Sequence, residues 1–268
     1  MAIEATALRL LVFVGVFALL AVAESVWPRR MAGADRGRRW LANLGLIAVN
    51  TVVVRLVYFA APTLAIAAAY AAQQWQWGLL PLFKAPDFAA LIIGFVVLDL
   101  AVYGQHVAMH HVPVLWRLHR VHHADAAFDV TTGLRFHPLE ILVSHAWKIG
   151  VIVLIGVPVA AALAFEIILN ASSMFSHANL KLPLGVDRWL RLAVVTPDMH
   201  RVHHSVERDE HDTNYGFNLS LWDRLFATYR PDARAPQEAM AIGLSGLKPA
   251  ETADLVWLLR FPFVREAS

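Results

Sequence analysis

The sequence predicts an all-α membrane protein: a polytopic bundle of about four or five transmembrane helices, one pair of them a hairpin, with a histidine-rich helical cap. Of its 268 residues, 58% are apolar and only 16% are charged, whereas a soluble domain carries about 25% charged residues. The mean hydropathy is +0.51. Long apolar stretches alternate with more polar ones, and no stretch has the composition of a linker. We therefore expect one membrane-embedded domain over residues 1–268.

The first apolar stretch runs from Leu10 to Ala23 without a charge, and its end imitates a signal-peptide cleavage site. Glu4 and Arg9 precede it, whereas a signal peptide begins with a basic segment. Five arginines follow it: Arg29, Arg30, Arg36, Arg38 and Arg39. We interpret the stretch as a retained helix. The positive-inside rule places the arginines in the cytoplasm and the N-terminus outside, in what we expect to be a bacterial inner membrane.

Three further regions are long enough to cross a bilayer core, which takes about 20 apolar residues per helix. Leu41 to Ala72 contains Pro62 and predicts a tilted or kinked span. Phe88 to Gln105 predicts the return to the cytoplasm. Ala146 to Ser176 has 31 residues, too many for one span, and Pro158 near its middle predicts a hairpin with both ends on the cytoplasmic side.

The more polar parts of the chain lie between these spans and after them. Residues 109–145 and those after Lys181 fall on the side of the arginine loop, so they predict one cytoplasmic cap. Within the cap, Leu255 to Leu259 includes Trp257 and predicts an interfacial amphipathic helix. The pI near 9.1 does not predict nucleic-acid binding, because this composition leaves little soluble surface for a basic patch.

The chain has 13 histidines and no cysteine, so histidine is the residue type from which metal ligands are expected. The absence of cysteine excludes disulfides, thiolate-bound zinc, iron–sulfur clusters and thiol nucleophiles. The pentapeptide His-Arg-Val-His-His occurs twice, at 119–123 and 200–204. In a helix, positions i, i+3 and i+4 share one face, so each repeat is expected to direct three imidazoles to one point.

Two further observations complete the set of predicted ligands. His106 and His110 have the i, i+4 spacing with which a helix places two ligands on one metal, and His177 ends a polar stripe. The nine candidate ligands are His106, His110, His119, His122, His123, His177, His200, His203 and His204. We leave His137 open between a ligand and a support for one. His145 and His211 are interpreted as ordinary surface or core histidines.

Two polar stripes lead down apolar helices toward these histidines. Each follows steps of four, three and four residues, one from Asp99 to His110 and the other from Glu166 to His177. Acids inside a membrane segment indicate a functional site, and metal sites need hydrogen-bond acceptors that orient the ligating imidazoles. The residues predicted for this supporting role are Asp99, Tyr103, Glu166, Asn170 and Ser173, together with Asp223 as a residue that holds a helix or a histidine in place.

The number of candidate ligands indicates the kind of site better than their type does. Imidazole suits iron, copper, nickel and zinc alike, but a tetrahedral zinc uses four ligands, so nine histidines predict two metal ions. Two other classes stay open. One is a non-enzymatic membrane protein that transports metal or carries electrons on haem; the other is a zinc-dependent hydrolase, which leaves half of the histidines unexplained.

These motifs resemble the membrane fatty acid hydroxylase and sterol desaturase superfamily, whose signature is HxxxH, HxxHH and a further HxxHH. The resemblance covers about residues 90–230, the expected catalytic region. It extends to Phe136-His137-Pro138-Leu139-Glu140, Ser176-His177-Ala178-Asn179, Asn214-Tyr215-Gly216 and Trp222-Asp223-Arg224-Leu225-Phe226. The tail also resembles a branch that cleaves ether lipids, the alkylglycerol monooxygenases. Some members have a complete HxxxH at the position of His177, where this chain has Lys181.

The resemblance implies a non-haem di-iron oxygenase. It would use two iron ions, which zinc can replace in a crystal, and O2 to hydroxylate or desaturate a C–H bond of a lipid such as a sterol, a fatty acyl chain or an ether lipid. Because the chain has no dinucleotide or flavin motif, a separate reductase, ferredoxin or cytochrome must supply the electrons. Six basic residues are candidates for docking it or for contact with lipid headgroups: Arg117, Arg120, Lys181, Arg188, Arg191 and Arg201.

Overall fold

The computed structural model describes residues 2–31, 33, 35–57 and 64–264, with side chains from Thr6 onward. The regular secondary structure of the described residues is helical, and they contain three isolated β-bridges but no longer strand. Within the described residues, five helices are long and apolar enough to cross a membrane, which confirms the predicted class. They are α1 (Ala2–Val26, its apolar part Thr6–Val26), α2 (Arg36–Val57), α5 (Asp87–His111), α7 (Pro138–Ile155) and α8 (Val159–His177).

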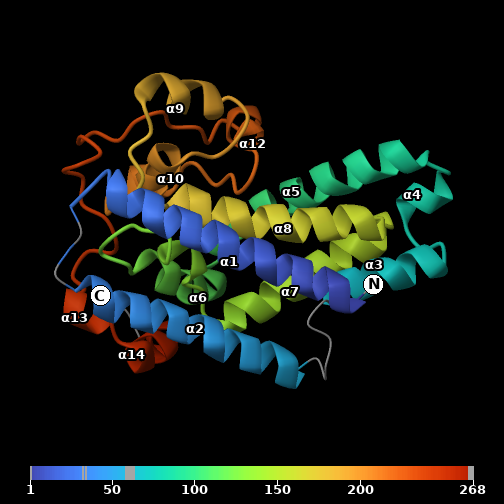
Figure 1. Ribbon diagram of the computed structural model, residues 1–268, viewed down its shortest axis with the longest axis horizontal. Helices are drawn as coiled ribbons and strands as arrows, with labels where there is room; N and C mark the ends of the chain where they lie inside the picture. Colours follow the sequence, from blue (N-terminus) through green and yellow to red (C-terminus); the bar gives the residue numbers. More distant parts are fainter. Residues whose placement is uncertain (1, 32, 34, 58–63, 265–268) are drawn as a thin grey trace.

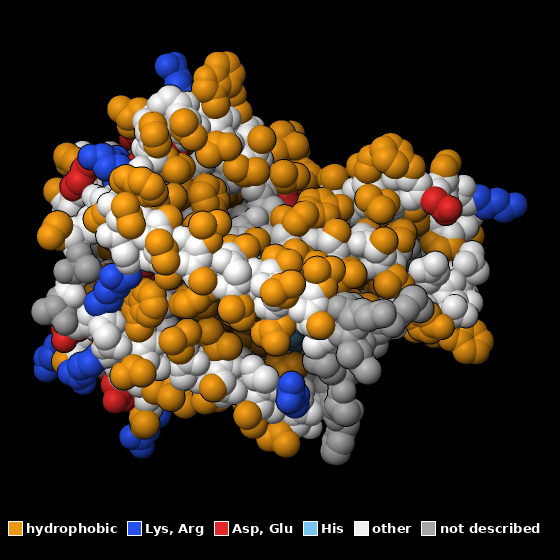
Figure 2. Space-filling view, viewed as in Figure 1, with side chains coloured by type: hydrophobic (Ala, Val, Ile, Leu, Met, Phe, Trp, Pro, Cys, Tyr) orange, Lys and Arg blue, Asp and Glu red, His pale blue; other side chains and the backbone are white. Residues whose placement is uncertain are grey.

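The five long helices lie side by side in one bundle (Figure 1). Helix α1 packs on α8, α2 packs on α7, and α5 packs on both α7 and α8. Helix α1 begins at the end of the bundle opposite the cap, the end at which α3 (Leu64–Gln74) and α4 (Leu79–Leu82) are also drawn. The surface over the long helices is largely apolar, as Figure 2 shows, and large residues such as Leu11 and Leu19 on α1 are mostly exposed. Such a surface is suited to lipid.

The predicted hairpin is present as α7 and α8, although its first leg begins earlier than expected. Helix α7 starts at Pro138 and not near Ala146, so residues that the sequence assigned to the polar cap belong to a candidate span. The turn between the legs needs glycine at Gly156, where φ is 76°. A Cβ atom there would also lie 2.5 Å from the carbonyl oxygen of Trp77.

The second apolar region was predicted to be one tilted or kinked span, and the structure differs from that prediction. Its residues divide between α2 and α3, and the expected kink at Pro62 lies outside the described residues. At about 1.5 Å per residue, the 11 residues of α3 are too short to cross a bilayer. Helix α3 instead packs its alanine face, Ala65 and Ala69, against α7 and α8.

The remaining helices form a cap at one end of the bundle (Figure 1). They are α6 (Pro113–His123), η1 (Thr132–Leu134), α9 (Leu184–Leu190), α10 (Pro197–His203), α11 (Arg208–His211), α12 (Leu221–Leu225), α13 (Pro249–Thr252), α14 (Leu255–Arg260) and η2 (Phe261–Phe263). The amphipathic helix expected near the C-terminus is α14. Its Leu258 is buried against Leu46 of α2, while Val256 on the other face is 60% exposed.

A buried ionic cluster ties the cap to α2. The Arg39 guanidinium donates to Asp125 over 2.6 and 2.8 Å and to Asp129 over 2.9 Å. Burial alone would raise the pKa of Asp125, but Arg39 and Arg135 hold it well below its usual range. Asp125 lies two residues after the first His-Arg-Val-His-His repeat, so this cluster also fixes the end of α6.

We predict that Arg39→Met destabilises the fold by about 3–5 kcal/mol, because it removes the cation that hydrogen-bonds both buried carboxylates and leaves only the more distant Arg135 beside Asp125. Denaturant unfolding of the detergent-solubilised protein measures the change. Arg38→Met is the matched control, since the neighbouring Arg38 is exposed. Equal stability of the two variants would contradict the assigned role.

Candidate metal centre

Four helix ends bring the histidines together in the cap. Helix α5 carries one pair in its last turns, and Pro113 begins α6 two residues after α5 ends. Proline suits that first position because its missing N–H has no helical partner there. His177 is the last residue of α8, and Thr196 caps the N-terminus of α10 by accepting from the Met199 N–H over 3.4 Å.

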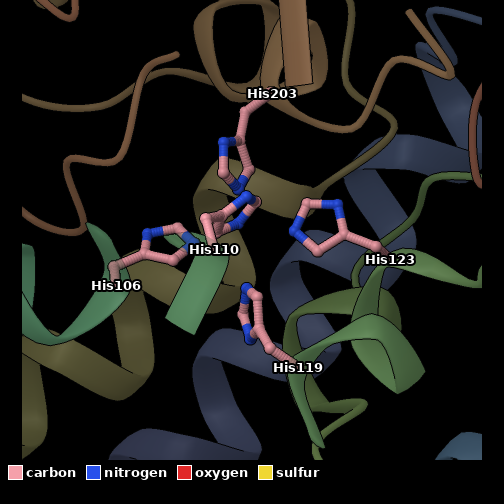
Figure 3. Close-up of side chains that lie close together, drawn as sticks. All are labelled: His106, His110, His119, His123 and His203. Atoms are coloured by element: carbon pink, nitrogen blue, oxygen red, sulfur yellow. The ribbon is translucent and has the colours of Figure 1, made fainter. Parts of the chain in front are cut away.

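One group holds five buried histidines, and Figure 3 shows their rings turned toward one another. Its members are His106, His110, His119, His123 and His203. In each member the Nε2 atom is buried and has no hydrogen-bond partner. An unpaired buried polar atom is costly, and one shared cation could satisfy all five of these atoms.

In four of the five members the opposite ring nitrogen, Nδ1, faces an acceptor, whereas Nδ1 of His123 has no hydrogen-bond partner. His106 Nδ1 donates to the carbonyl oxygen of Tyr215 over 2.7 Å, and His203 Nδ1 donates to that of Thr213 over 2.7 Å. A carbonyl can only accept, so Nδ1 carries the proton and the Nε2 lone pair is free. This is the arrangement in which a metal-binding histidine is oriented by its other nitrogen.

Two carboxylates play the same part. His119 Nδ1 donates to Glu140 over 2.6 Å, and both side chains are buried. His110 Nδ1 lies 3.3 Å from Asp212 Oδ1. His211, interpreted from the sequence as an ordinary surface or core histidine, completes a smaller group with His110 and Asp212, so it lies beside the centre.

The second group holds His122, His177, His200 and His204. The Nε2 atom of His177 lies 3.1 Å from that of His122, 3.2 Å from that of His204 and 3.1 Å from that of His200. His177 Nδ1 donates to the Ser173 carbonyl over 2.7 Å, so its Nε2 offers only a lone pair. One lone pair cannot satisfy three neighbours. Ligands at 90° and about 2.1 Å from one ion lie about 3.0 Å apart, close to these separations.

Burial keeps the cap histidines neutral. It lowers the pKa of His119 to about 3, and the pKa values of His122 and His200 lie well below the ordinary value for the same reason, with a further lowering by neighbouring imidazoles. A metal ligand must be deprotonated, so these side chains are in their binding form at neutral pH.

Each His-Arg-Val-His-His repeat divides between the two groups, and the expectation that it converges on one point is wrong. His119 and His123 belong to the first group and His122 to the second, while His200 and His204 belong to the second and His203 to the first. At about 100° per residue, positions i and i+4 lie about 40° apart, and i+3 lies about 60° to the other side of i. Each repeat therefore spans both groups.

The structure places all nine candidate ligands in the two groups and His137 in neither. His137 caps α7: its Nδ1 accepts from the Leu139 N–H over 3.2 Å, and its Nε2 donates to the Leu259 carbonyl over 3.2 Å. Both ring nitrogens are thus engaged elsewhere. His145 also lies outside the groups and lines a cavity.

The polar stripes make fewer contacts with histidines than expected. Of the six residues predicted to support the ligands, Ser173 contacts one directly, through its carbonyl. Asp223 acts one step away, because it accepts from the Tyr215 N–H over 2.7 Å and the Tyr215 carbonyl holds His106. Asp99 accepts from Trp222 over 2.7 Å.

The other three predicted supports have partners away from the histidines. Tyr103 pairs with Thr228 over 2.9 Å, and Asn170 donates to the Glu166 carbonyl over 2.7 Å. The Glu166 carboxylate accepts from Lys148 over 2.6 Å and from an arginine of α1 over 2.9 Å. Asp99 and Tyr103 thus hold the segment after α11, and Glu166 belongs to an ionic cluster.

Sequence reasoning missed the groups that do orient the imidazoles. Glu140 is the last residue of the Phe-His-Pro-Leu-Glu segment and lies in the first turn of α7. Its acidic side chain in that segment was the one signal that could have identified it. The carbonyls of Thr213 and Tyr215 give no sequence signal, because every residue has one. The chain's fold alone brings them to the histidines.

A cavity of about 360 Å³ adjoins the first group. His106 and His119 line one end of it, and side chains of α1, α2, α5, α7 and α8 form its walls. Figure 2 shows the apolar surface hollowed between α1 and α2, two of these walls. The size lies within the range of small-molecule sites, about 300–1,000 Å³.

The described part of the chain has five helices long and apolar enough to cross a membrane, and two of them, α5 and α8, contribute histidines at their ends to two adjoining buried groups. These features are those of an integral membrane protein in which each group could hold a metal ion. The sequence profile of the fatty acid hydroxylase family matches residues 91–228, and the chain belongs to that family.

The chain is similar to lipid-modifying enzymes of known activity. It is 31% identical over 156 residues to the ornithine lipid hydroxylase OlsE of Rhizobium tropici, covering 58% of this chain and 46% of that protein. It is 30% identical over 152 residues to the alkylglycerol monooxygenase of Homo sapiens, covering 56% of this chain and 32% of that enzyme. The chain thus spans less than half the length of these relatives. No solved structure matches it.

Proposed function

We propose that this protein is a membrane-bound di-iron oxygenase that hydroxylates or desaturates a C–H bond of a lipid. The proposal is carried by the arrangement of the Nε2 atoms. Those of the first group are buried without a hydrogen-bond partner. In the adjoining second group, three Nε2 atoms lie 3.1–3.2 Å from that of His177. When bound, two iron ions would supply the activation of O2 that no side chain provides.

The residues of the chain fit such a centre in three ways. The five histidines of the first group and the four of the second would each hold one ion. Glu140 and the carbonyls of Ser173, Thr213 and Tyr215 fix which nitrogen faces it. The cavity beside His106 and His119 would accept the lipid, and its helical walls would exclude water from the reacting carbon.

The family and its lipid-modifying members favour this class over the other two. A haem carrier or a metal transporter has no use for two adjoining groups of five and four histidines, and a zinc hydrolase needs one such group at most. In this proposal the cap lies in the cytoplasm of an inner membrane and the N-terminus lies outside.

The electrons of the reaction are proposed to come from a separate protein. Two of the six basic residues considered for its docking are wrong candidates, because Arg120 and Arg201 are buried: Arg120 donates to the Phe261 carbonyl over 2.7 Å, and Arg201 pairs with Asp198. Arg117, Lys181 and Arg188 are exposed on the cap.

Comparative lipid analysis of cells with and without the gene tests the proposed reaction. We expect one lipid class to gain one oxygen or to lose two hydrogens only when the protein is present, and the change to vanish in a His203→Ala variant. The exposed His111 belongs to neither group, so His111→Gln is the matched control. An unchanged lipid profile with well-expressed protein would contradict the proposal.

A further inference from the structure

One segment of the cap, residues 215–226, packs along a face of α5. We call it the α12 segment. Its Trp222 is buried against Tyr103 of α5, and the Phe226 ring stacks on that of Tyr103 with the centroids 5.4 Å apart. These contacts fall within Asp87–His111, which is long and apolar enough to cross a membrane. The α5 residues that pack with the segment are Val96, Leu100, Tyr103 and Val107.

The same face of α5 is bare farther from the cap. Ile92 precedes Val96 by four residues, as Val96 precedes Leu100, so these side chains share one face of the helix. Ile92 and its neighbour Ile93 are exposed, and an exposed apolar face on a candidate span is suited to lipid. The α12 segment therefore covers the continuation of this face, at a place where lipid would otherwise lie.

The outer side of the segment is apolar as well. Leu221, Leu225 and Phe226 are each more than half exposed. The helix α9 and the turn after it add Trp189 and Leu192, which are 75% and 58% exposed. We call these five residues the apolar cap patch. Figure 2 shows apolar side chains gathered over α9 and α12 as they are over the long helices, and a large exposed apolar patch marks an interaction or membrane surface.

The backbone of the α12 segment is paired in the way that a lipid environment requires. Irregular backbone at membrane depth is tolerated only where the protein satisfies its polar groups. The N–H groups of Tyr215 and Gly216 donate to the Asp223 carboxylate over 2.7 and 2.8 Å. The Leu219 N–H donates to the Asp99 carboxylate of α5 over 3.3 Å. Two buried acids thus serve a segment whose outer side chains are apolar.

The two parts of the apolar cap patch are joined to each other. The Ser220 N–H donates to the carbonyl of Ala193, just after α9, over 3.1 Å. Next to Trp189 on α9 stands the exposed Arg188. Tryptophan is enriched at the membrane–water interface, and basic residues are enriched on its cytoplasmic side. The composition of the patch and its edge is therefore that of an interfacial element.

We infer that the apolar cap patch is inserted into the bilayer, in the leaflet on the side of the cap. Its occupant is lipid, as it is for the exposed face of α5 that the α12 segment continues. Helices α9 and α12 then hold the cap against the membrane beside α5, whose last turns carry His106 and His110. The inference concerns how the protein sits in the membrane and does not depend on the proposed reaction.

Dye labels at single positions test the inference. The chain has no cysteine, so one introduced cysteine carries a nitrobenzoxadiazole dye at a known place. Full-length Leu225→Cys and Trp189→Cys proteins are labelled and placed in vesicles of phosphatidylethanolamine and phosphatidylglycerol. Lipid with a doxyl group near its headgroup quenches a dye in the membrane, and iodide quenches a dye in water.

Two further labels provide the references. Leu19→Cys places the dye on the apolar surface of α1, and Arg208→Cys places it on the cap, where the Arg208 side chain is 92% exposed. We expect the doxyl lipid to quench the Leu225 and Trp189 labels several-fold more than the Arg208 label. Iodide should quench them several-fold less, as it does the Leu19 label.

Iodide quenching of both patch labels at the level of the Arg208 label overturns the inference, because the patch then faces water. Weak quenching by both agents also overturns it, since a second copy of the chain or another protein then covers the patch. The two labels lie on different helices, so if one variant does not fold, the other remains decisive.

Discussion

Replacement of His177 by alanine is expected to remove one of the two proposed metal ions and to abolish the proposed lipid oxidation. His177 is the centre of its group, with Nε2 atoms of three other histidines 3.1–3.2 Å from its own. Removing only the partner that orients a ligand costs about 10–100-fold in metal affinity or activity. Loss of the ligand itself should exceed the upper end of that range.

The measurement is iron per chain in purified His177→Ala protein, together with product formation. We expect the iron content to fall to that of one site, because the five histidines of the first group are untouched. His111→Ala provides the control, since it removes an imidazole outside both groups. Full iron content and activity in His177→Ala would show that the second group does not bind a functional metal.

Replacement of Glu140 by alanine has the second largest expected effect. The carboxylate accepts from His119 Nδ1 over 2.6 Å inside the protein. Without it, the imidazole can rotate or change tautomer, and the freed N–H loses its partner in a buried site. We expect metal affinity at the first group to fall about 10–100-fold, measured by competition with a chelator.

The conservative variant separates positioning from folding. Glu140→Gln keeps a carbonyl oxygen for His119, so it should retain more affinity than Glu140→Ala. Glu207→Ala is the control, because Glu207 is an exposed acid of the cap. If Glu140→Ala and Glu207→Ala bind metal equally well, Glu140 does not orient His119.

The membrane bundle was accessible to sequence reasoning because lipid imposes a simple rule. A span must be apolar over about 20 residues, and this pattern identified four apolar regions. Dividing the longest of them at Pro158 into a hairpin gave the fifth helix, and all five candidate helices overlap these regions. The exception is the stretch now divided between α2 and α3. Apolar composition cannot distinguish a span from a short helix that packs its alanines on α7 and α8.

The centre was predicted only in part, for reasons of geometry. Helical spacing identified the nine histidines, but it could not show that His122 and His203 would each leave their neighbours for the other group. That division depends on how α6 and α10 face each other. The groups that orient the rings are mostly carbonyls, such as that of Ser173, which carry no sequence signature.

Metal analysis of iron-replete, detergent-purified full-length protein tests the central claim most directly, that the two histidine groups are two iron sites. The account predicts two iron ions per chain, falling to one in His177→Ala. A well-folded wild-type protein that binds one iron or none after iron-replete expression would contradict it.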